Sequence, residues 1–181
     1  MSLPLDLTFA PMEADVAKAI PAGREWEYEP KWDGFRCLSF RDGESVSIMS
    51  KSSQPLARYF PEITAALLTL KPKEFVLDGE IIATEKSSLD FDALLQRIHP
   101  AESRIRKLAK ETPATLVVFD LLVNEQGEDF TGRVLDERRN ELERFAGKYL
   151  QENERIRLSP RTRDFETAKN WFQRMAGPLD A

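Results

Sequence analysis

A lysine with acidic and basic neighbours stands in the stretch EPKWDGFR. The stretch contains Glu29, Lys31, Asp33, Gly34 and Arg36. A lysine amine attacks phosphorus or a carbonyl carbon only when it is neutral, and its ordinary pKa is about 10.4, so this chemistry needs burial or nearby positive charge. Arg36 or a bound metal would supply that charge. Asp33 and Gly34 would form the turn that aims the lysine, the aspartate through local hydrogen bonds and the glycine through a positive φ. The same four-residue pattern also occurs by chance.

Two further residues are candidates because they interrupt or end apolar runs. Glu80 stands inside FVLDGEIIA, where a carboxylate is costly unless it meets a ligand hydroxyl, a metal or another partner. An outward-facing position on a strand explains Glu80 as well. Phe119 ends the run TLVVF, and it is either a core aromatic or a platform on which a base stacks. Both pairs of explanations stay open on the residues alone.

The composition fits one globular domain. The chain has 181 residues, of which 41% are hydrophobic and 31% charged, and its net charge is −5. The negative total argues against a protein held to nucleic acid by bulk electrostatics alone. Two basic clusters are either phosphate contacts or solvated faces. They are Arg104, Arg106, Lys107 and Lys110, and then Arg155, Arg157, Arg161 and Arg163.

Features of secreted, membrane and zinc proteins are not found in the sequence. It has no run of about 18 apolar residues, and its first residues do not resemble a signal peptide, so we expect a cytoplasmic protein with no membrane partner. Cys37 is the single cysteine, which excludes an internal disulfide. Together with the lone His99 it does not make a zinc site. We expect His99 to lie at the surface or to cap a helix.

The elements that must position these residues are a mixture of strands and helices. Residues 26–49 predict a strand, a turn at Asp33-Gly34 and a hairpin closed by Asp42-Gly43, so Lys31 would lie at a sheet edge. Further strands are predicted in FVLDGEIIA, ATLVVFDLLV and RIRLSPRTR. Helices are predicted in PEITAALLTL, FDALLQRI, ESRIRKLAKE, the segment 134–149 and FETAKNWFQRMA. The residues from Ser87 to Asp90 would cap the second of these, Asp164 would cap the last, and Gly177 and Pro178 would stop it. No Gly-rich turn joins a strand to a helix, so we expect an α+β domain with mainly antiparallel sheets and helices packed outside.

Four segments resemble, in order, the motifs of ATP-dependent DNA ligases and related nucleotidyltransferases. EPKWDGFR resembles the K-x-D-G-x-R motif, and SKSSQPLARYFPEI the motif after the first hairpin. FVLDGEIIA resembles the D-G-E motif and VVFDLL the motif with the base-stacking phenylalanine. LDFDALLQRIHPAESR is similar to the bacterial ligase C type and to the ligase domain of ligase D. The resemblance covers essentially the whole chain and implies a nucleotidyltransferase (ATP-grasp-like) adenylation domain.

The resemblance implies a role for each candidate. Lys31 would attack the α-phosphorus of ATP, expel pyrophosphate and carry AMP, which then passes to the 5′-phosphate at a DNA nick. Glu29 would accept a hydrogen bond from the adenine amino group, and Phe119 would stack on the adenine. Arg36 and Glu80 would hold the ribose, with Glu80 also near Mg²⁺ or Mn²⁺. The implied setting is a bacterial, nucleoid-associated monomer that acts on nicked double-stranded DNA in repair, recombination and non-homologous end joining, with a Ku-type end-binding protein as a candidate partner.

Two departures from the family pattern limit this expectation. Lys51 stands where the family usually has arginine, and lysine does not make a bidentate phosphate contact, so its contact with ATP or DNA is an open assignment. Two later lysine-containing motifs and the C-terminal OB domain are not found in the 181 residues. We therefore expect residues 1–181 to be a truncated, partial adenylation domain that forms lysyl-AMP slowly or not at all, because lost charge-stabilising groups slow phosphoryl transfer by orders of magnitude.

Three alternatives remain from the sequence. A GTP-using capping-type enzyme is the nearest, but Glu29 suits the amino group of adenine better than the O6 of guanine. An NAD-dependent ligase would need an upstream nicotinamide-binding domain before the lysine motif. A non-catalytic module that binds DNA or a repair partner is suggested by the two basic clusters.

Overall fold

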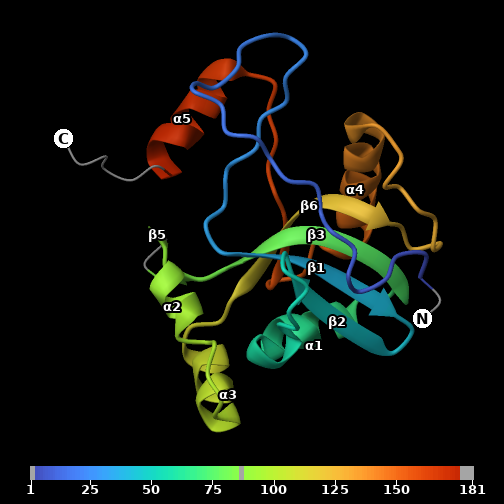
Figure 1. The fold of residues 1–181 in the computed structure, drawn as a ribbon, viewed down its shortest axis with the longest axis vertical. Helices are drawn as coiled ribbons and strands as arrows, with labels where there is room; N and C mark the ends of the chain where they lie inside the picture. The colour runs from blue at the N-terminus through green and yellow to red at the C-terminus, as the bar shows by residue number, and fades with distance from the viewer. Residues whose placement is uncertain (1–2, 86–87, 176–181) are drawn as a thin grey trace. The chain divides into compact units, whose positions relative to one another are not determined.

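The computed structural model describes residues 3–85 and 88–175, which form two compact units. The larger unit contains residues 3–11 and Asp33–Leu158. The smaller unit contains Met12–Trp32 and residues 159–175. Figure 1 shows the helices and strands of both units.

The larger unit alternates strands and helices along the chain, as the mixed sequence pattern predicts. Its strands are β1 (Phe35–Asp42), β2 (Ser45–Ser50), β3 (Glu74–Ile82), β4 (Thr84–Glu85), β5 (Ser88–Leu89), β6 (Thr115–Val123) and β7 (Ile156–Leu158). Its helices are the short 3₁₀ turn η1 (Ala57–Tyr59), α1 (Pro61–Thr69), α2 (Phe91–Leu95), α3 (Glu102–Glu111) and α4 (Leu135–Tyr149).

A five-stranded sheet organises this unit in the order β2-β1-β3-β6-β7 (Figure 1). The pairings of β1 with β2, β1 with β3 and β3 with β6 are antiparallel, whereas β6 and β7 are parallel. The prediction of an α+β fold with mainly antiparallel pairing is therefore confirmed. The single parallel pairing makes the sheet mixed, which the sequence analysis did not predict.

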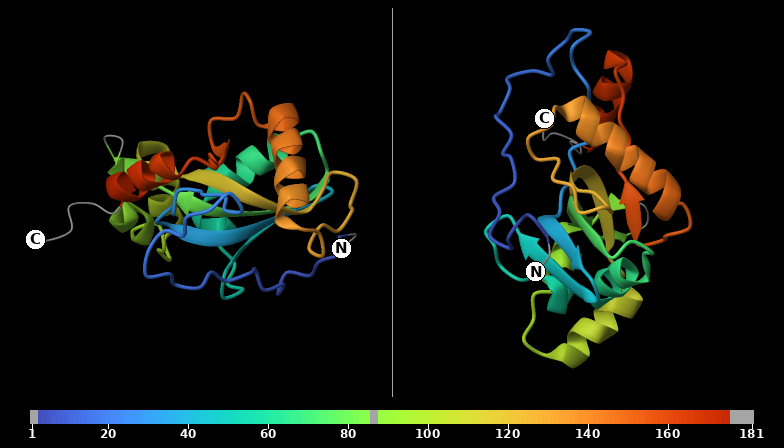
Figure 2. Two further views of the ribbon diagram at one scale, coloured as in Figure 1. Left: turned by 90° about the horizontal axis from the view of Figure 1, so that it is seen from above. Right: turned by 90° about the vertical axis from the view of Figure 1, so that its right-hand side faces the viewer.

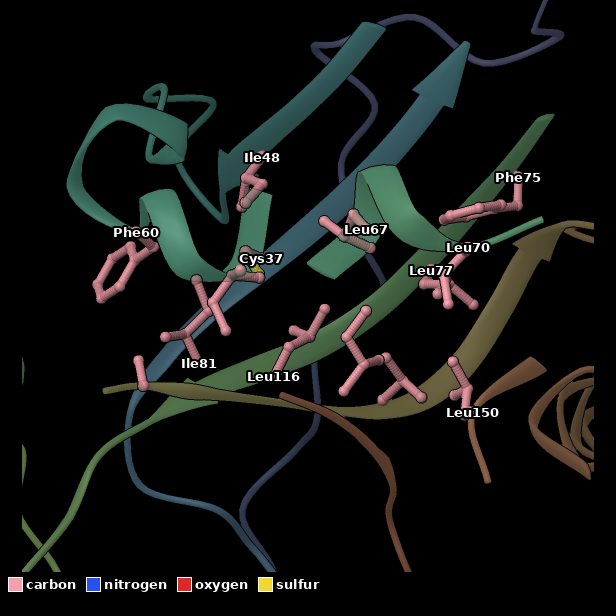
Figure 3. Packing of buried hydrophobic residues seen from close by; sticks show 14 of the residues in the cluster. Cys37, Ile48, Phe60, Leu67, Leu70, Phe75, Leu77, Ile81, Leu116 and Leu150 are labelled. Carbon is pink, nitrogen blue, oxygen red and sulfur yellow. The ribbon is translucent and has the colours of Figure 1, made fainter. Parts of the chain in front are cut away.

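The two faces of the sheet are buried by different parts of the unit. One face packs against α1, α2 and α4 through a cluster that includes Cys37, Leu67 and Phe145, part of which is shown in Figure 3. The other face is covered at one end by the N-terminal segment, where Leu3 and Leu5 are buried. Helix α4 and the N-terminal segment lie on opposite sides of the sheet in Figure 2. The remaining part of the second face is where polar residues gather.

Local sequence signals account for most of these elements. The period-two hairpin is formed by β1 and β2, and Pro61 occupies the first turn of α1. Asp90 caps α2 by accepting a hydrogen bond of 2.9 Å from the backbone N–H of Ala93. Helix α2 ends at Leu95, earlier than its apolar run predicts.

One predicted strand is wrong. Residues 26–32 do not form a strand, and β1 begins only at Phe35. In this segment only Tyr28 forms an isolated antiparallel bridge, with Thr162. Pro30 has no N–H to donate to a ladder and restricts the residue before it, so it interrupts the pattern of alternating residues.

The smaller unit contains α5 (Phe165–Met175). Its predicted cap is present: the Asp164 carboxylate accepts a hydrogen bond of 2.8 Å from the Thr167 backbone N–H. The predicted stop at Gly177 and Pro178 lies outside the described residues.

Candidate functional site

Three polar side chains project from one face of the sheet in the larger unit. Arg36 of β1 lies directly opposite Glu80 of β3, and Leu38 lies opposite Asp78. Side chains of opposed residues point to the same side, as do those two positions apart along a strand. Arg36, Asp78 and Glu80 therefore share the face that the N-terminal segment covers at its other end. Glu80 is half-buried on this face. The structure therefore brings together Arg36 and Glu80, two of the predicted site residues.

Arg36 is held by a two-point ion pair with Asp78. The Arg36 Nε donates to Asp78 Oδ1 at 3.2 Å, and Nη2 donates to Oδ2 at 2.9 Å. The side chain of Asp78 is only 4% exposed and that of Arg36 25%. Burial raises the pKa of Asp78 above its ordinary value, although Arg36 acts in the opposite direction. This ion pair fixes the orientation of the Arg36 guanidinium through Nε and Nη2, and Nη1 takes no part in it.

Phe119 belongs to the same face, and β6 contains an extra residue at this point. Asp120 lies opposite Asp78 and Val118 lies opposite Gly79, so Phe119 between them has no partner on β3. This arrangement is a β-bulge, which changes the direction of side chains. The guanidinium carbon of Arg36 lies 5.5 Å from the centre of the Phe119 ring, within the range of a cation–π interaction. The half-buried ring is thus next to Arg36, and its role as a base platform stays a prediction.

Lys51 lies beside Arg36 in the chain that follows β2. Its backbone N–H donates to the Arg36 carbonyl at 3.3 Å, and its side chain is exposed. Gly34 departs from the expectation of a positive φ. A Cβ at this position would overlap the carbonyl oxygen of Ile81, so close approach of two backbone segments explains the glycine. The K-x-D-G motif therefore needs glycine for space rather than for its dihedral freedom.

The predicted nucleophile lies in a segment that is anchored on both sides. Before Lys31, the backbones of Tyr28 and Thr162 exchange hydrogen bonds of 2.8 and 2.9 Å. After it, Trp32 Nε1 donates to Ser159 Oγ at 3.0 Å. Lys31 itself is exposed. The prediction that it lies at a sheet edge beside a turn is therefore wrong, and the lysine instead stands in a tethered irregular segment.

The predicted site residues divide between the two units. Glu29 and Lys31 belong to the smaller unit, and both are exposed. Arg36, Glu80 and Phe119 belong to the larger one and meet on its sheet face. That Glu29 and Lys31 act together with Arg36, Glu80 and Phe119 in one site stays a prediction.

Three residues next to the site were missed by the sequence analysis. They are Asp78, Asp120 and Arg138, the last on α4. Both aspartates stand in otherwise apolar strands, which is the signal that singled out Glu80. Arg138 carries no comparable signal, because an arginine in a charged amphipathic helix is ordinary.

The basic clusters are less available than the sequence implies. All four cations of the first cluster are exposed on α3, but two of them form ion pairs within the helix. Arg106 Nη2 lies 2.6 Å from Glu102 Oε1, and Lys107 Nζ lies 3.8 Å from Glu111 Oε1. The second cluster is divided between the two units after Leu158. His99 is half-buried, and its Nδ1 accepts a hydrogen bond of 3.0 Å from the backbone N–H of Ala101, just before α3, but no side chain caps that helix.

The described residues contain neither a cluster of metal-binding side chains nor a helix suited to a membrane. Within residues 3–85 and 88–175, no group of three or more His, Cys, Asp or Glu side chains is placed to hold a metal ion. In the same ranges, no helix combines the length and apolar character needed to cross a membrane.

Solved structures define the class of fold. A structure described as mycobacterial DNA ligase D complexed with ATP and MES aligns with a TM-score of 0.67, over 91% of this chain and 52% of that one, at 22% sequence identity. The ligase domain of M. tuberculosis LigD aligns with a TM-score of 0.60, over 81% of this chain and 45% of that one, also at 22% identity. The chain therefore has the fold of a DNA ligase adenylation domain.

Sequence comparison gives the family. A family model described as ATP dependent DNA ligase domain matches residues 10–177. DNA ligase C of Mycobacterium tuberculosis is 46% identical over 178 residues, which are 98% of this chain and 49% of the relative. DNA ligase C2 of Mycolicibacterium smegmatis is 44% identical over 177 residues, 98% and 48% of the two chains. The chain belongs to the ATP-dependent DNA ligase domain family, and it spans about half the length of these relatives.

Proposed function

We propose that this chain is the adenylation domain of an ATP-dependent DNA ligase and that Lys31 is the residue that receives AMP. The observation that carries the proposal is the site on the sheet face, where Arg36, Glu80 and Phe119 converge, in a chain whose family match includes the lysine motif. Each of these three residues comes from a different one of the matching motifs.

The proposed first step is a phosphoryl transfer. The neutral Lys31 Nζ attacks the α-phosphorus of ATP, a P–N bond forms, the P–O bond to pyrophosphate breaks, and the amine proton passes to solvent. Phe119 would stack on the adenine and Glu29 would accept a hydrogen bond from its amino group. Arg36, already fixed by Asp78, would offer its Nη1 to the ribose region. In later steps AMP would pass to a 5′-phosphate at a nick, and the 3′-hydroxyl would displace it.

The residues present fit a divalent cation held in part by ATP. Mg²⁺ usually binds through one or two carboxylates together with substrate phosphates, and Glu80 supplies such a carboxylate. Glu80 is half-buried on the sheet face, directly opposite Arg36, and is therefore the proposed protein ligand. The ion, Mg²⁺ or Mn²⁺, would neutralise charge on the phosphates during transfer.

The proposal is tested with ATP labelled at the α-phosphate. We expect the chain to bind ATP and to acquire label that resists denaturation. Lys31→Ala should abolish the label, whereas Lys71→Ala, at an exposed lysine after α1, should keep it. GTP should compete poorly. Label that persists in Lys31→Ala, equal competition by GTP, or no binding of ATP by calorimetry would contradict the proposal.

Sealing of nicked DNA and docking of a Ku-type end-binding protein are proposals for the protein that contains this domain. A nick-sealing assay with that protein and its Lys31→Ala variant tests the first. A pull-down with the purified end-binding protein tests the second.

A further inference from the structure

The bulge in β6 places two consecutive residues on the same sheet face. In a regular strand Phe119 and Asp120 would point to opposite sides. Here Asp120 lies opposite Asp78, which faces the site, and Phe119 contacts Arg36 on that same face. Val118 on the other side of the bulge is fully buried in the core cluster. If Phe119 and Asp120 followed the regular alternation after Val118, Asp120 would point into that core.

Arg138 of α4 holds Asp120 at this bulge. Its Nε donates to both carboxylate oxygens at 3.0 Å, and its Nη2 lies 2.9 Å from Oδ2. The Asp120 Oδ1 also accepts the backbone N–H of Leu121 at 2.8 Å. The Arg138 Nη1 donates to the carbonyl of Arg133 at 2.8 Å. One carboxylate and one guanidinium thus tie β6 at its bulge to the start of α4.

The pair also balances charge between neighbouring strands. Asp78 and Asp120 are opposed carboxylates, a destabilising arrangement unless each is neutralised. Arg36 neutralises the first and Arg138 the second. The Arg138 and Asp120 side chains are 8% and 18% exposed, so solvent screens little of this interaction.

We infer that Arg138 is a positioning residue for base recognition: by holding Asp120 it fixes the β6 bulge and so directs the Phe119 ring toward the bound adenine. The inference rests on the proposed function, because it assigns a purpose to the platform of that same site. Arg138 does not touch the nucleotide in this scheme. It acts through Asp120 and the strand.

A double-mutant cycle on ATP affinity tests this role. Phe119→Leu removes the stacking surface and is expected to weaken ATP binding about tenfold, a typical effect of losing one base–aromatic stack. Arg138→Gln should weaken it to a similar degree. The double variant should be no more than about twofold weaker than either single one, because both changes remove the same interaction.

The control is Arg133→Gln, which alters an exposed arginine just before α4 and should change ATP affinity less than twofold. Asp120→Asn keeps the size of the side chain and an oxygen for the Leu121 N–H, so it repeats the test if Arg138→Gln does not fold. Folding of each variant is checked by urea unfolding before affinity is measured.

The outcomes separate this inference from the proposed function. If the unaltered chain does not bind ATP, the proposed function fails. If it binds ATP and Phe119→Leu weakens binding, but Arg138→Gln and Asp120→Asn bind like the unaltered chain, only the inference fails. Losses that add in the double variant would show a general structural effect and would also overturn it.

Discussion

Arg36 of β1 and Asp78 of β3 are diagonal neighbours on one sheet face, and two hydrogen bonds join the guanidinium to a carboxylate that is almost fully buried. Each residue neutralises the charge of the other at a position that is largely shielded from solvent. The arginine is the more hydrated of the two, so the effect of breaking the pair depends on which side is changed.

Asp78→Asn should therefore destabilise the chain by about 2 kcal/mol. Arg36 loses a charged acceptor, but its partial exposure lets water replace some of the lost hydrogen bonding, and the cost of burying a carboxylate disappears. Urea unfolding measures the change. Asp15→Asn, at an exposed position in residues 12–32, is the control and should have no effect. Equal stability of Asp78→Asn and the unaltered chain would show that the pair contributes nothing net.

A methyl group at Gly79 should disrupt the pairing of β3 with β6. The added Cβ would lie 2.5 Å from the carbonyl oxygen of Val117, a backbone atom that moves only with its strand. We expect Gly79→Ala to cost about 2 kcal/mol, in the range of overpacking. Gly147→Ala on α4 meets nothing within 4 Å and should instead stabilise by about 0.5 kcal/mol. Thermal unfolding of the two variants should shift in opposite directions, and a shared direction would contradict the prediction.

The thiol of Cys37 should react only when β1 opens. Cys37 is 1% exposed in the main core cluster, and burial raises the pKa of its thiol far above the ordinary value. As the single cysteine of the chain, it gives an unambiguous signal. A chromogenic disulfide reagent should label the native chain very slowly, and the rate should rise through the urea transition. Rapid labelling in native buffer would mean that this strand is open in solution.

Arg144 should make the chain sensitive to acid. Burial raises the pKa of Glu125, but the hydrogen bond and positive charge of Arg144, together with further hydrogen bonds, more than offset this, so the pKa lies below its ordinary value. Hydrogen bonds from Arg144 also lower the pKa of Glu141. Carboxylates with lowered pKa values stabilise the fold above their ordinary pKa of about 4.5, and this contribution is lost as the pH falls through the lowered values.

Arg144→Met should accordingly cost about 1 kcal/mol near neutral pH, a modest figure because the arginine side chain is 42% exposed. Urea unfolding between about pH 7 and about pH 3 should show the two chains converging as acid is added. The matched control is Arg106→Met, at an exposed pair on α3, which should track the unaltered chain throughout. A gap between Arg144→Met and the unaltered chain that stays constant with pH would refute the assignment.

The elements that were predicted correctly are those whose signals are local. The period-two hairpin of β1 and β2 and the caps at Asp90 and Asp164 depend on residues close in sequence. The segment 26–32 alternates in the same way, yet it forms no strand, because Pro30 cannot donate to a ladder. The prediction gave more weight to the alternation than to this proline.

The predicted site was less complete for a different reason. Glu80 and Phe119 were found because their residue types are unusual in their runs, and the larger unit places both beside Arg36. The bulge at Phe119 depends on how β6 pairs with β3, more than thirty residues earlier. The partner of Asp120 comes from α4, which no local pattern connects to β6. Contacts of this kind are set by tertiary packing.

Leu3 and Leu5 pack on the apolar end of the sheet face whose other end carries Arg36 and Glu80. A bulky affinity tag or fluorescent fusion joined ahead of Leu3 would start at this face and disturb the packing of the two leucines on it. Protein prepared for binding or labelling measurements should therefore carry a cleavable spacer there, or its nucleotide affinity will report on the tag as well as on the site.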